Sequence, residues 1–142
     1  MTEQIEGLDE LAEKLASMGA KVGGRNLSKA ARFATTPLVT AARRRVPQSN
    51  EGHRLYTGEW VAPAYTKRKG IKKRVKLSRD KTRVWSDVGV TDKAYYSTQF
   101  VERGTSKQPA QPWLVPAFDA TKDQVLDRMK SRLKKLVEDA AR

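Results

Sequence analysis

Apolar residues recur at steps of three and four in three parts of this chain, and such spacing predicts helices. The first helix is short and ends at Gly19 or at the Gly23-Gly24 pair. The last helix, residues 117–140, is the longest. Asp119, Asp123 and Asp127 lie in its first half, and Lys130, Arg132, Lys134 and Lys135 lie in its second half, a distribution that suits the helix dipole. The apolar positions of the first helix are Leu8, Leu11, Ala12, Leu15 and Met18; those of the last are Phe118, Val125, Leu126, Met129, Leu133, Leu136, Val137 and Ala140.

An alanine-rich helix is predicted between these two, starting at Asn26 or Ser28 and ending before Pro47. Pro37 interrupts it, so either the helix kinks there or a new helix begins with Thr36 as its cap. We favour a single kinked helix, because the apolar stripe keeps its phase across the proline. That stripe consists of Leu27, Ala30, Ala31, Ala34, Leu38, Ala41, Ala42 and Val46.

Alternation of apolar and polar residues predicts three strands in the middle of the chain, at 59–67, 71–77 and 84–90. Residues 78–81 supply the turn between the last two strands. Pro63 marks an edge position or a break in the first strand. Together the strands predict a small antiparallel meander that carries a basic hairpin.

The segment 100–119 is unusual because prolines stand among large apolar side chains. It follows a predicted short helix at 94–102 that Gly104 ends. Proline fixes φ and donates no amide hydrogen bond, so the segment is neither a central strand nor a continuous helix. Its prolines are Pro109, Pro112 and Pro116, and its apolar residues are Trp113, Leu114, Val115 and Phe118.

Two interpretations of this segment are open. As part of the core, Trp113 and Phe118 lie beneath the last helix. As an interface, a preorganised loop presents Trp113 and Leu114 to another subunit and loses little entropy on binding. In the interpretation that combines them, Phe118 anchors the helix in the core and residues 102–111 face a neighbour.

The pattern as a whole predicts an α+β fold in a single domain, residues 1–142. A small antiparallel sheet with a basic hairpin packs against an N-terminal helix, a kinked alanine-rich helix and a long C-terminal helix. The hairpin, residues 67–83, is expected to protrude, and residues 104–116 are expected to form a proline-rich loop.

Composition adds a strong and uneven positive charge. The net charge is +13, with 38% hydrophobic and 32% charged residues and a mean hydropathy of −0.70. Residues 67–83 carry ten bases and one acid, whereas residues 1–24 carry five acids and two bases. Such a field favours polyanions or acidic protein surfaces as partners.

The chain is poor in reactive groups, so no enzyme activity, metal or cofactor is expected. It has no cysteine and one histidine, His53, with no partner placed by spacing. Gly23-Gly24-Arg25 lacks the strand and the lysine of a phosphate-binding loop. No apolar run approaches the ~20 residues that a membrane span needs. The acidic start is unlike a signal peptide, so an intracellular protein is expected.

The basic segment has two interpretations. Its outer face can lie along a phosphate backbone, with Trp60, Tyr65 or Trp85 stacking on bases, or it is a solvated edge whose lysines deter aggregation. We favour contact with a polyanion or an acidic partner, because ten bases exceed what edge protection needs. The candidate contact residues are Lys67, Arg68, Lys69, Lys72, Lys73, Arg74, Lys76 and Arg79.

Several motifs resemble one known family. They are Gly-Leu-x-x-Leu (from Gly7), Arg-x-Pro (Arg45 to Pro47), Thr57-Gly58, Val88-Gly89, Val-Glu-x-Gly-Thr (Val101 to Thr105) and Ala-Gln-Pro-aromatic-Leu-x-Pro-Ala (Ala110 to Ala117). This order resembles the neck, head–tail joining or tail-completion proteins of long-tailed bacteriophages. The chain departs from that family at Arg103, where an aromatic is frequent, and at Trp113, where phenylalanine is usual.

The resemblance implies a structural virion protein without catalysis, made in the host cytoplasm and located at the head–tail junction. It would form a homo-oligomeric ring there and contact the tail terminator and the head-closure protein. In such a ring the acidic start of one subunit can meet the basic hairpin of the next. The candidate subunit-interface residues are Glu102, Gly104, Thr105, Gln111, Pro112 and Trp113.

Two other classes of function are weighed against this one. The first is a nucleic-acid-binding module that grips DNA without sequence preference through the basic hairpin. The second is a small toxin-like ribonuclease, which the missing acid and base residues argue against.

Overall fold

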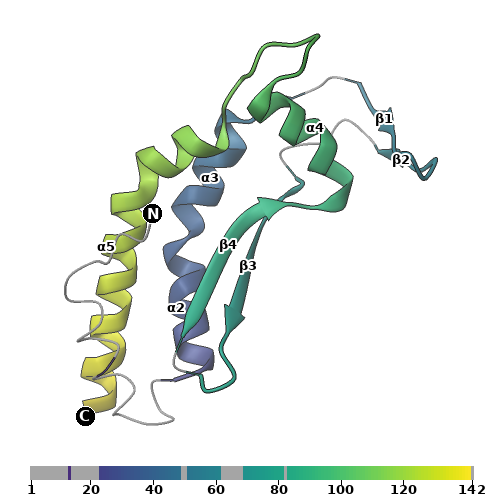
Figure 1. Ribbon diagram of the computed structural model, residues 1–142. Helices are drawn as coiled ribbons and strands as arrows, with labels where there is room; N and C mark the ends of the chain where they lie inside the picture. Colours follow the sequence, from purple (N-terminus) through teal and green to yellow (C-terminus); the bar gives the residue numbers. More distant parts are fainter. Residues whose placement is uncertain (1–12, 14–22, 49–50, 62–68, 82, 142) are drawn as a thin grey trace.

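The computed structural model describes residues 13, 23–48, 51–61, 69–81 and 83–141 of the 142-residue chain (Figure 1). The predicted N-terminal helix lies outside the described residues, as do Pro63, Tyr65, Lys67 and Arg68. The elements are α2 (Arg25–Ala34), α3 (Thr36–Arg45), β1 (His53–Arg54), β2 (Trp60–Val61), β3 (Ile71–Leu77), β4 (Val84–Val90), α4 (Asp92–Arg103) and α5 (Leu114–Ala141).

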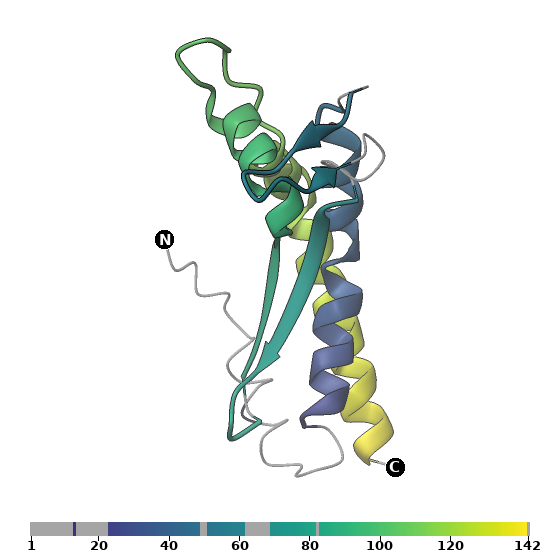
Figure 2. The ribbon, with the colours of Figure 1, turned by 90° about the vertical axis from the view of Figure 1, so that its right-hand side faces the viewer.

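Helices and a hairpin form an α+β arrangement, as the sequence predicts. The pair α2 and α3 lies in the middle, with α5 along one side and the β3–β4 hairpin along the other (Figure 1). The molecule is elongated, with the loop between α4 and α5 at one end and the C-terminus at the other (Figure 2).

The alanine-rich helix is divided at one residue. Thr35 separates α2 from α3, and Pro37, in the first turn of α3, has no amide to donate. The buried face nevertheless continues across the break, as expected for a kink. The structure thus lies between the two alternatives, with two helices that share one apolar stripe. Its buried members are Ala30, Ala31, Ala34, Leu38, Val39, Ala42 and Val46.

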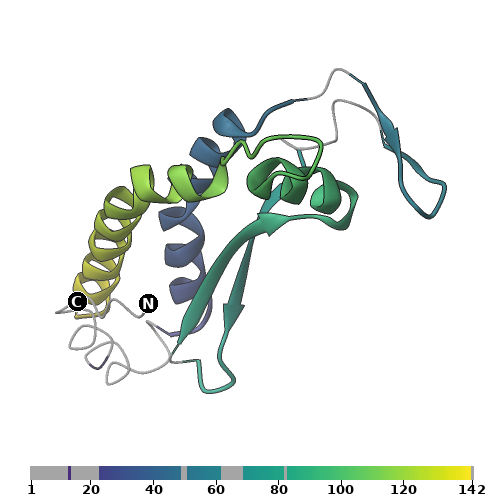
Figure 3. The ribbon, with the colours of Figure 1, turned by 45° about the horizontal axis from the view of Figure 1, so that its top comes forward.

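Among the described residues the strands form two separate two-stranded sheets, and Trp60–Val61 of the predicted first strand does not join β3. The rest of that predicted strand, residues 62–67, lies outside the described residues. β2 pairs with β1, which precedes it, and the short hairpin between them extends away from the helices (Figure 3). Its turn includes Gly58, whose φ of +84° favours glycine. β3 and β4 pair antiparallel, from Ile71 opposite Val90 to Leu77 opposite Val84.

The basic hairpin does not protrude, contrary to the prediction. Its inner face packs on α2 and α3, and Ile71 on that face is fully buried. Arg43 of α3 fastens the start of β3 by donating from Nη2 to the Ile71 carbonyl at 2.9 Å. A basic strand can lie against helices because its side chains alternate between a buried and an exposed face.

The core consists of two apolar clusters along the helices. The first brings Val101 of α4 and Trp113, which precedes α5, together with residues of α3 and β3. The second lies between α2 and the end of α5. Phe118, predicted to anchor α5 in the core, is 52% exposed, so that prediction is wrong. Ala117 and Thr121, one turn apart, take the inward positions instead. The first cluster contains Leu38, Val39, Ala42, Val46, Ile71, Val101, Trp113 and Ala117; the second contains Ala30 and Leu133, with Leu27, Met129, Leu136, Val137 and Ala140 packed against them.

Leu133→Ala tests whether the second cluster stabilises the helix pair. Leu133 is 4% exposed, and its truncation leaves a cavity between α2 and α5. We expect the free energy of unfolding to fall by about 2–5 kcal/mol. Urea denaturation measures the change. The neighbouring Lys134→Ala, on an exposed position, should change it by less than about 0.5 kcal/mol. Equal effects of the two substitutions would contradict this account.

Candidate functional site

The most constrained feature of the chain is the start of α5, where a carboxylate from α4 caps the helix. Glu102 accepts hydrogen bonds from three consecutive amides: Trp113 at 2.6 Å, Leu114 at 3.0 Å and Val115 at 3.3 Å. The first amides of a helix have no partner within it, and a negative charge there also suits the helix dipole. Glu102, a residue of α4, therefore takes the role of an N-cap side chain for α5.

The loop between α4 and α5 is closed at its base by the backbone. Gly104 has φ +77°, and a Cβ atom there would lie 2.7 Å from the amide nitrogen of Ala110, so only glycine fits without a shift. The Gln111 amide donates to the Val101 carbonyl at 2.7 Å, and the Thr105 amide to the Gln108 carbonyl at 2.8 Å. Residues 105–112 are all exposed. The result is a fixed loop held away from the body of the molecule (Figure 1).

Trp113 belongs to the core. It is 3% exposed, and its Nε1 donates to the carbonyl of the buried Thr98 at 3.3 Å. The prediction that Trp113 lies at a subunit interface is therefore wrong, because the side chain is buried within its own subunit. Of the other candidates, Thr105, Gln111 and Pro112 are exposed, whereas Glu102 and Gly104 are half-buried.

The outer face of the β3–β4 hairpin brings three predicted contact residues together. Lys72, Arg74 and Lys76 alternate along β3 and are exposed. Across the pair, Lys76 stands opposite Trp85, which is 49% exposed, and Arg74 stands opposite Asp87. Two more candidates, Lys69 and Arg79, are also exposed. Trp60 lies in β2, in the other sheet, and Tyr65 lies outside the described residues, so Trp85 is the candidate stacking residue that the structure shows beside these cations.

Lys73 lies on the inner face of the hairpin, unlike its neighbours. Its Nζ donates to the Arg32 carbonyl at 2.6 Å and to Thr36 Oγ1 at 2.7 Å. On the paired strand, Ser86 Oγ donates to Thr35 Oγ1 at 3.1 Å. The hairpin is thus fastened to the break between α2 and α3. Lys73 was predicted to contact a partner together with Lys72 and Arg74, but the period of two along the strand places it on the opposite side of β3, toward α2.

The surroundings of Lys73 disfavour its charge. Partial burial lowers the pKa of its ammonium below the usual 10.5, and repulsion from Arg32, Arg128 and Arg43 lowers it further. These arginines come from three different helices, so the structure gathers like charges around one lysine.

A second basic surface was not foreseen from the sequence. Arg25, Lys29 and Arg32 are exposed on α2. Arg128 and Arg132 of α5 lie over the ring of Phe33, which also belongs to α2. The signal was present in the charge pattern: no acid occurs between Glu13 and Glu51. The bases of that stretch are less dense than those of residues 67–83, although it includes the run Arg43-Arg44-Arg45.

Comparison with known proteins adds no relative. No family model, no curated protein and no solved structure matches this chain. In the parts of the chain that the structure describes, no group of three acidic, histidine or cysteine side chains is placed to hold a metal ion. None of the helices within those parts combines the length and the apolar character needed to cross a membrane.

Glu102→Gln tests the cap on α5. The substitution keeps the size of the side chain but removes the charge that accepts from three amides. We expect the free energy of unfolding to fall by about 1–3 kcal/mol in urea denaturation. Glu138→Gln, exposed near the other end of α5, is the matched control and should change it by less than about 0.5 kcal/mol. A loss at Glu102 no larger than the control would rule out the cap as a source of stability.

Lys73→Met tests the effect of pH at the fastening of the hairpin. Between the lowered folded pKa of Lys73 and 10.5, the unfolded chain binds more protons there than the folded one. Stability from this group therefore rises with pH over that interval. We expect the difference in free energy of unfolding, wild type minus variant, to increase from pH 7 to pH 10.5. Urea denaturation of both proteins measures it, and the titrations that they share cancel. A difference that falls with pH would be inconsistent with this sign.

Proposed function

We propose that this chain is a structural subunit of the neck of a long-tailed bacteriophage, where it assembles as a ring at the head–tail junction and joins tail to head. The proposal begins from the resemblance of its motifs to that family. Its expected neighbours are the tail terminator and the head-closure protein, and its place is the virion.

One structural observation supports the proposal. The two most specific motif segments, Val101–Thr105 and Ala110–Ala117, meet at the start of α5 and build the loop together. Their residues hold a loop whose tip makes little contact with its own domain. A rigid exposed loop loses little conformational entropy on binding, which is what a permanent contact between subunits requires.

Some residues of this region hold the loop in its shape, and others are exposed for contact with a neighbour. Glu102, Gly104 and Trp113 fix the shape of the loop from below, and residues 105–112 form the surface that a neighbour can contact. This division separates folding from assembly. We expect substitution of the first group to destabilise the subunit and substitution of the second group to leave it folded.

A second candidate is sequence-independent binding of nucleic acid by the outer face of the hairpin. The observation that favours it is the placement of Trp85 opposite Lys76, beside Arg74 and Lys72. An exposed aromatic among cations is a common arrangement for contact with single strands. Asp87, on the same face, lowers the positive potential there.

Electron microscopy of phage particles tests the ring proposal. Particles that lack this protein should appear as separate heads and tails, and intact virions would overturn the proposal. In complementation, Lys107→Glu at the loop tip should reduce joined particles by about tenfold or more, because charge reversal at an interface repels the partner. Lys130→Glu, exposed on α5, is the charge-matched control. Equal yields from both variants would show that the tip is not the contact.

A further inference from the structure

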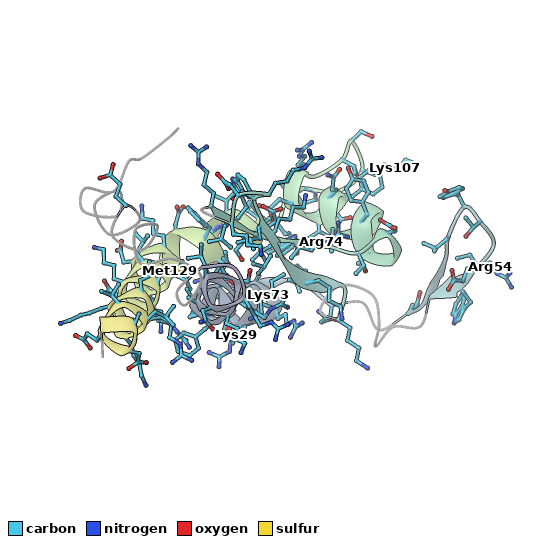
Figure 4. The ribbon with its side chains drawn as sticks, turned by 90° about the horizontal axis from the view of Figure 1, so that it is seen from below. Lys29, Arg54, Lys73, Arg74, Lys107 and Met129 are labelled. Atoms are coloured by element: carbon cyan, nitrogen blue, oxygen red, sulfur yellow. The ribbon has the colours of Figure 1, made fainter. Side chains whose placement is uncertain are left out.

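Six cations from three elements surround one exposed aromatic on the outer side of α2. We name this surface the α2 basic face; it consists of Arg25, Lys29, Arg32, Phe33, Lys73, Arg128 and Arg132. Steps of four and three place Arg25, Lys29 and Arg32 on one side of α2, away from the buried alanines. Figure 4 shows Lys29 and Lys73 beside this helix, with Arg74 farther away on the hairpin.

Contacts in the structure join the three elements into one surface. Lys73 of β3 donates to the carbonyl of Arg32 at 2.6 Å. On the other side of α2, the guanidinium carbons of Arg128 and Arg132 lie 4.0 and 5.1 Å from the centre of the Phe33 ring. Phe33 is 42% exposed beneath them. The cations are therefore held by packing as well as by their positions along the chain.

Like charges lie close together on this face. No carboxylate occurs in α2 or β3, whereas α5 carries five, among them Asp127 next to Arg128. The pKa of Lys73 is lowered first by partial burial and then by repulsion from Arg32, Arg128 and Arg43, of which Arg32 and Arg128 belong to the face. A solvated surface normally intersperses both signs of charge, which avoids such repulsion. A bound anion would relieve it.

We infer that the α2 basic face binds the phosphate backbone of nucleic acid without reading its sequence. The first and last bases on α2, Arg25 and Arg32, stand seven positions apart, about 10 Å along the helix. A strand of duplex DNA presents a phosphate about every 3.4 Å along its axis, so several phosphates face this row at once. Arginine suits the task because its planar fork donates two hydrogen bonds to one phosphate.

The elements packed beside α2 explain why this face would contact the phosphate backbone of nucleic acid and not the bases in a groove. A recognition helix enters the major groove, and for that its outer half must stand free. α2 packs against α5 on one side and against the β3–β4 hairpin on the other. Arg128 and Lys73 flank it at the level of the face, so the whole surface meets the phosphates together.

An acidic protein is the other anionic partner to consider. Protein interfaces concentrate binding energy in buried aromatic and apolar anchors at their centre. Among the seven residues of the face only Phe33 is apolar, and two guanidinium groups already cover its ring. The face thus offers charge without an apolar centre, which fits a phosphate backbone better.

The inference does not rest on the ring proposal, and the surface differs from the outer face of the hairpin. Lys72, Arg74 and Lys76 point to the opposite side of β3 from Lys73. Two matched triple variants separate these surfaces: Arg25→Gln with Lys29→Gln and Arg32→Gln, and Lys72→Gln with Arg74→Gln and Lys76→Gln. Both lose three charges, so a difference between them reports position and not net charge.

The experiment measures binding of the purified protein to fluorescein-labelled 24-base-pair duplexes of two unrelated sequences, by anisotropy between 50 and 200 mM NaCl. We expect equal affinity for the two sequences. The α2 triple variant should reduce the slope of log K against log salt by about 2–3, because about 0.9 is lost for each phosphate contact. Its affinity at 100 mM salt should fall by about tenfold or more, and that of the hairpin triple variant by about threefold or less.

Three outcomes would overturn the inference. They are no binding at 50 mM salt, an equal or greater loss in the hairpin variant, and displacement of the duplex by polyglutamate at equal charge concentration, which would assign the face to an acidic protein. Circular dichroism checks that both variants fold. If the α2 variant does not, the pair Arg128→Gln with Arg132→Gln on α5 replaces it, with an expected slope change of about 1–2.

Discussion

The fold depends on one carboxylate that lies in α4 and caps the start of α5. Glu102 lies in the last turn of α4 and accepts hydrogen bonds from the first amides of α5, so the preceding helix fixes the start of the longest one. Trp113, buried directly below, packs into the cluster that joins α3, β3 and α5. Without this acceptor three amides near the core would lose a partner that water only partly replaces. The loop, the helix axis and the main core therefore share one anchor.

The sequence predicted the regular elements well and their tertiary partners poorly. The β3–β4 hairpin and the short helix before Gly104 occur close to their predicted positions, because local alternation and periodicity determine them. The role of Glu102 could not be predicted in this way, since its partners lie eleven to thirteen residues ahead. Phe118 shows the reverse case. Its size indicated a core residue, but the crossing of α5 turns the neighbouring Ala117 inward.

The charged surfaces also show that a sequence predicts local elements better than the contacts between them. The dense run of bases in residues 67–83 indicated one basic surface, and the strand places alternate members of that run on opposite faces. The α2 basic face arises because α2, β3 and α5 come together, and each contributes only a few cations. Spacing along one helix is visible in a sequence, whereas convergence of three elements is not. The missing acids between Glu13 and Glu51 were the one available sign.

The closed loop between α4 and α5 also has a mechanical consequence. α5 has 28 residues, which corresponds to a rod of about 42 Å. Its first turn is bonded to Glu102, and Gly104 and Gln111 close the loop directly beside it. A force applied to the loop tip is thus transmitted to the helix without an intervening hinge.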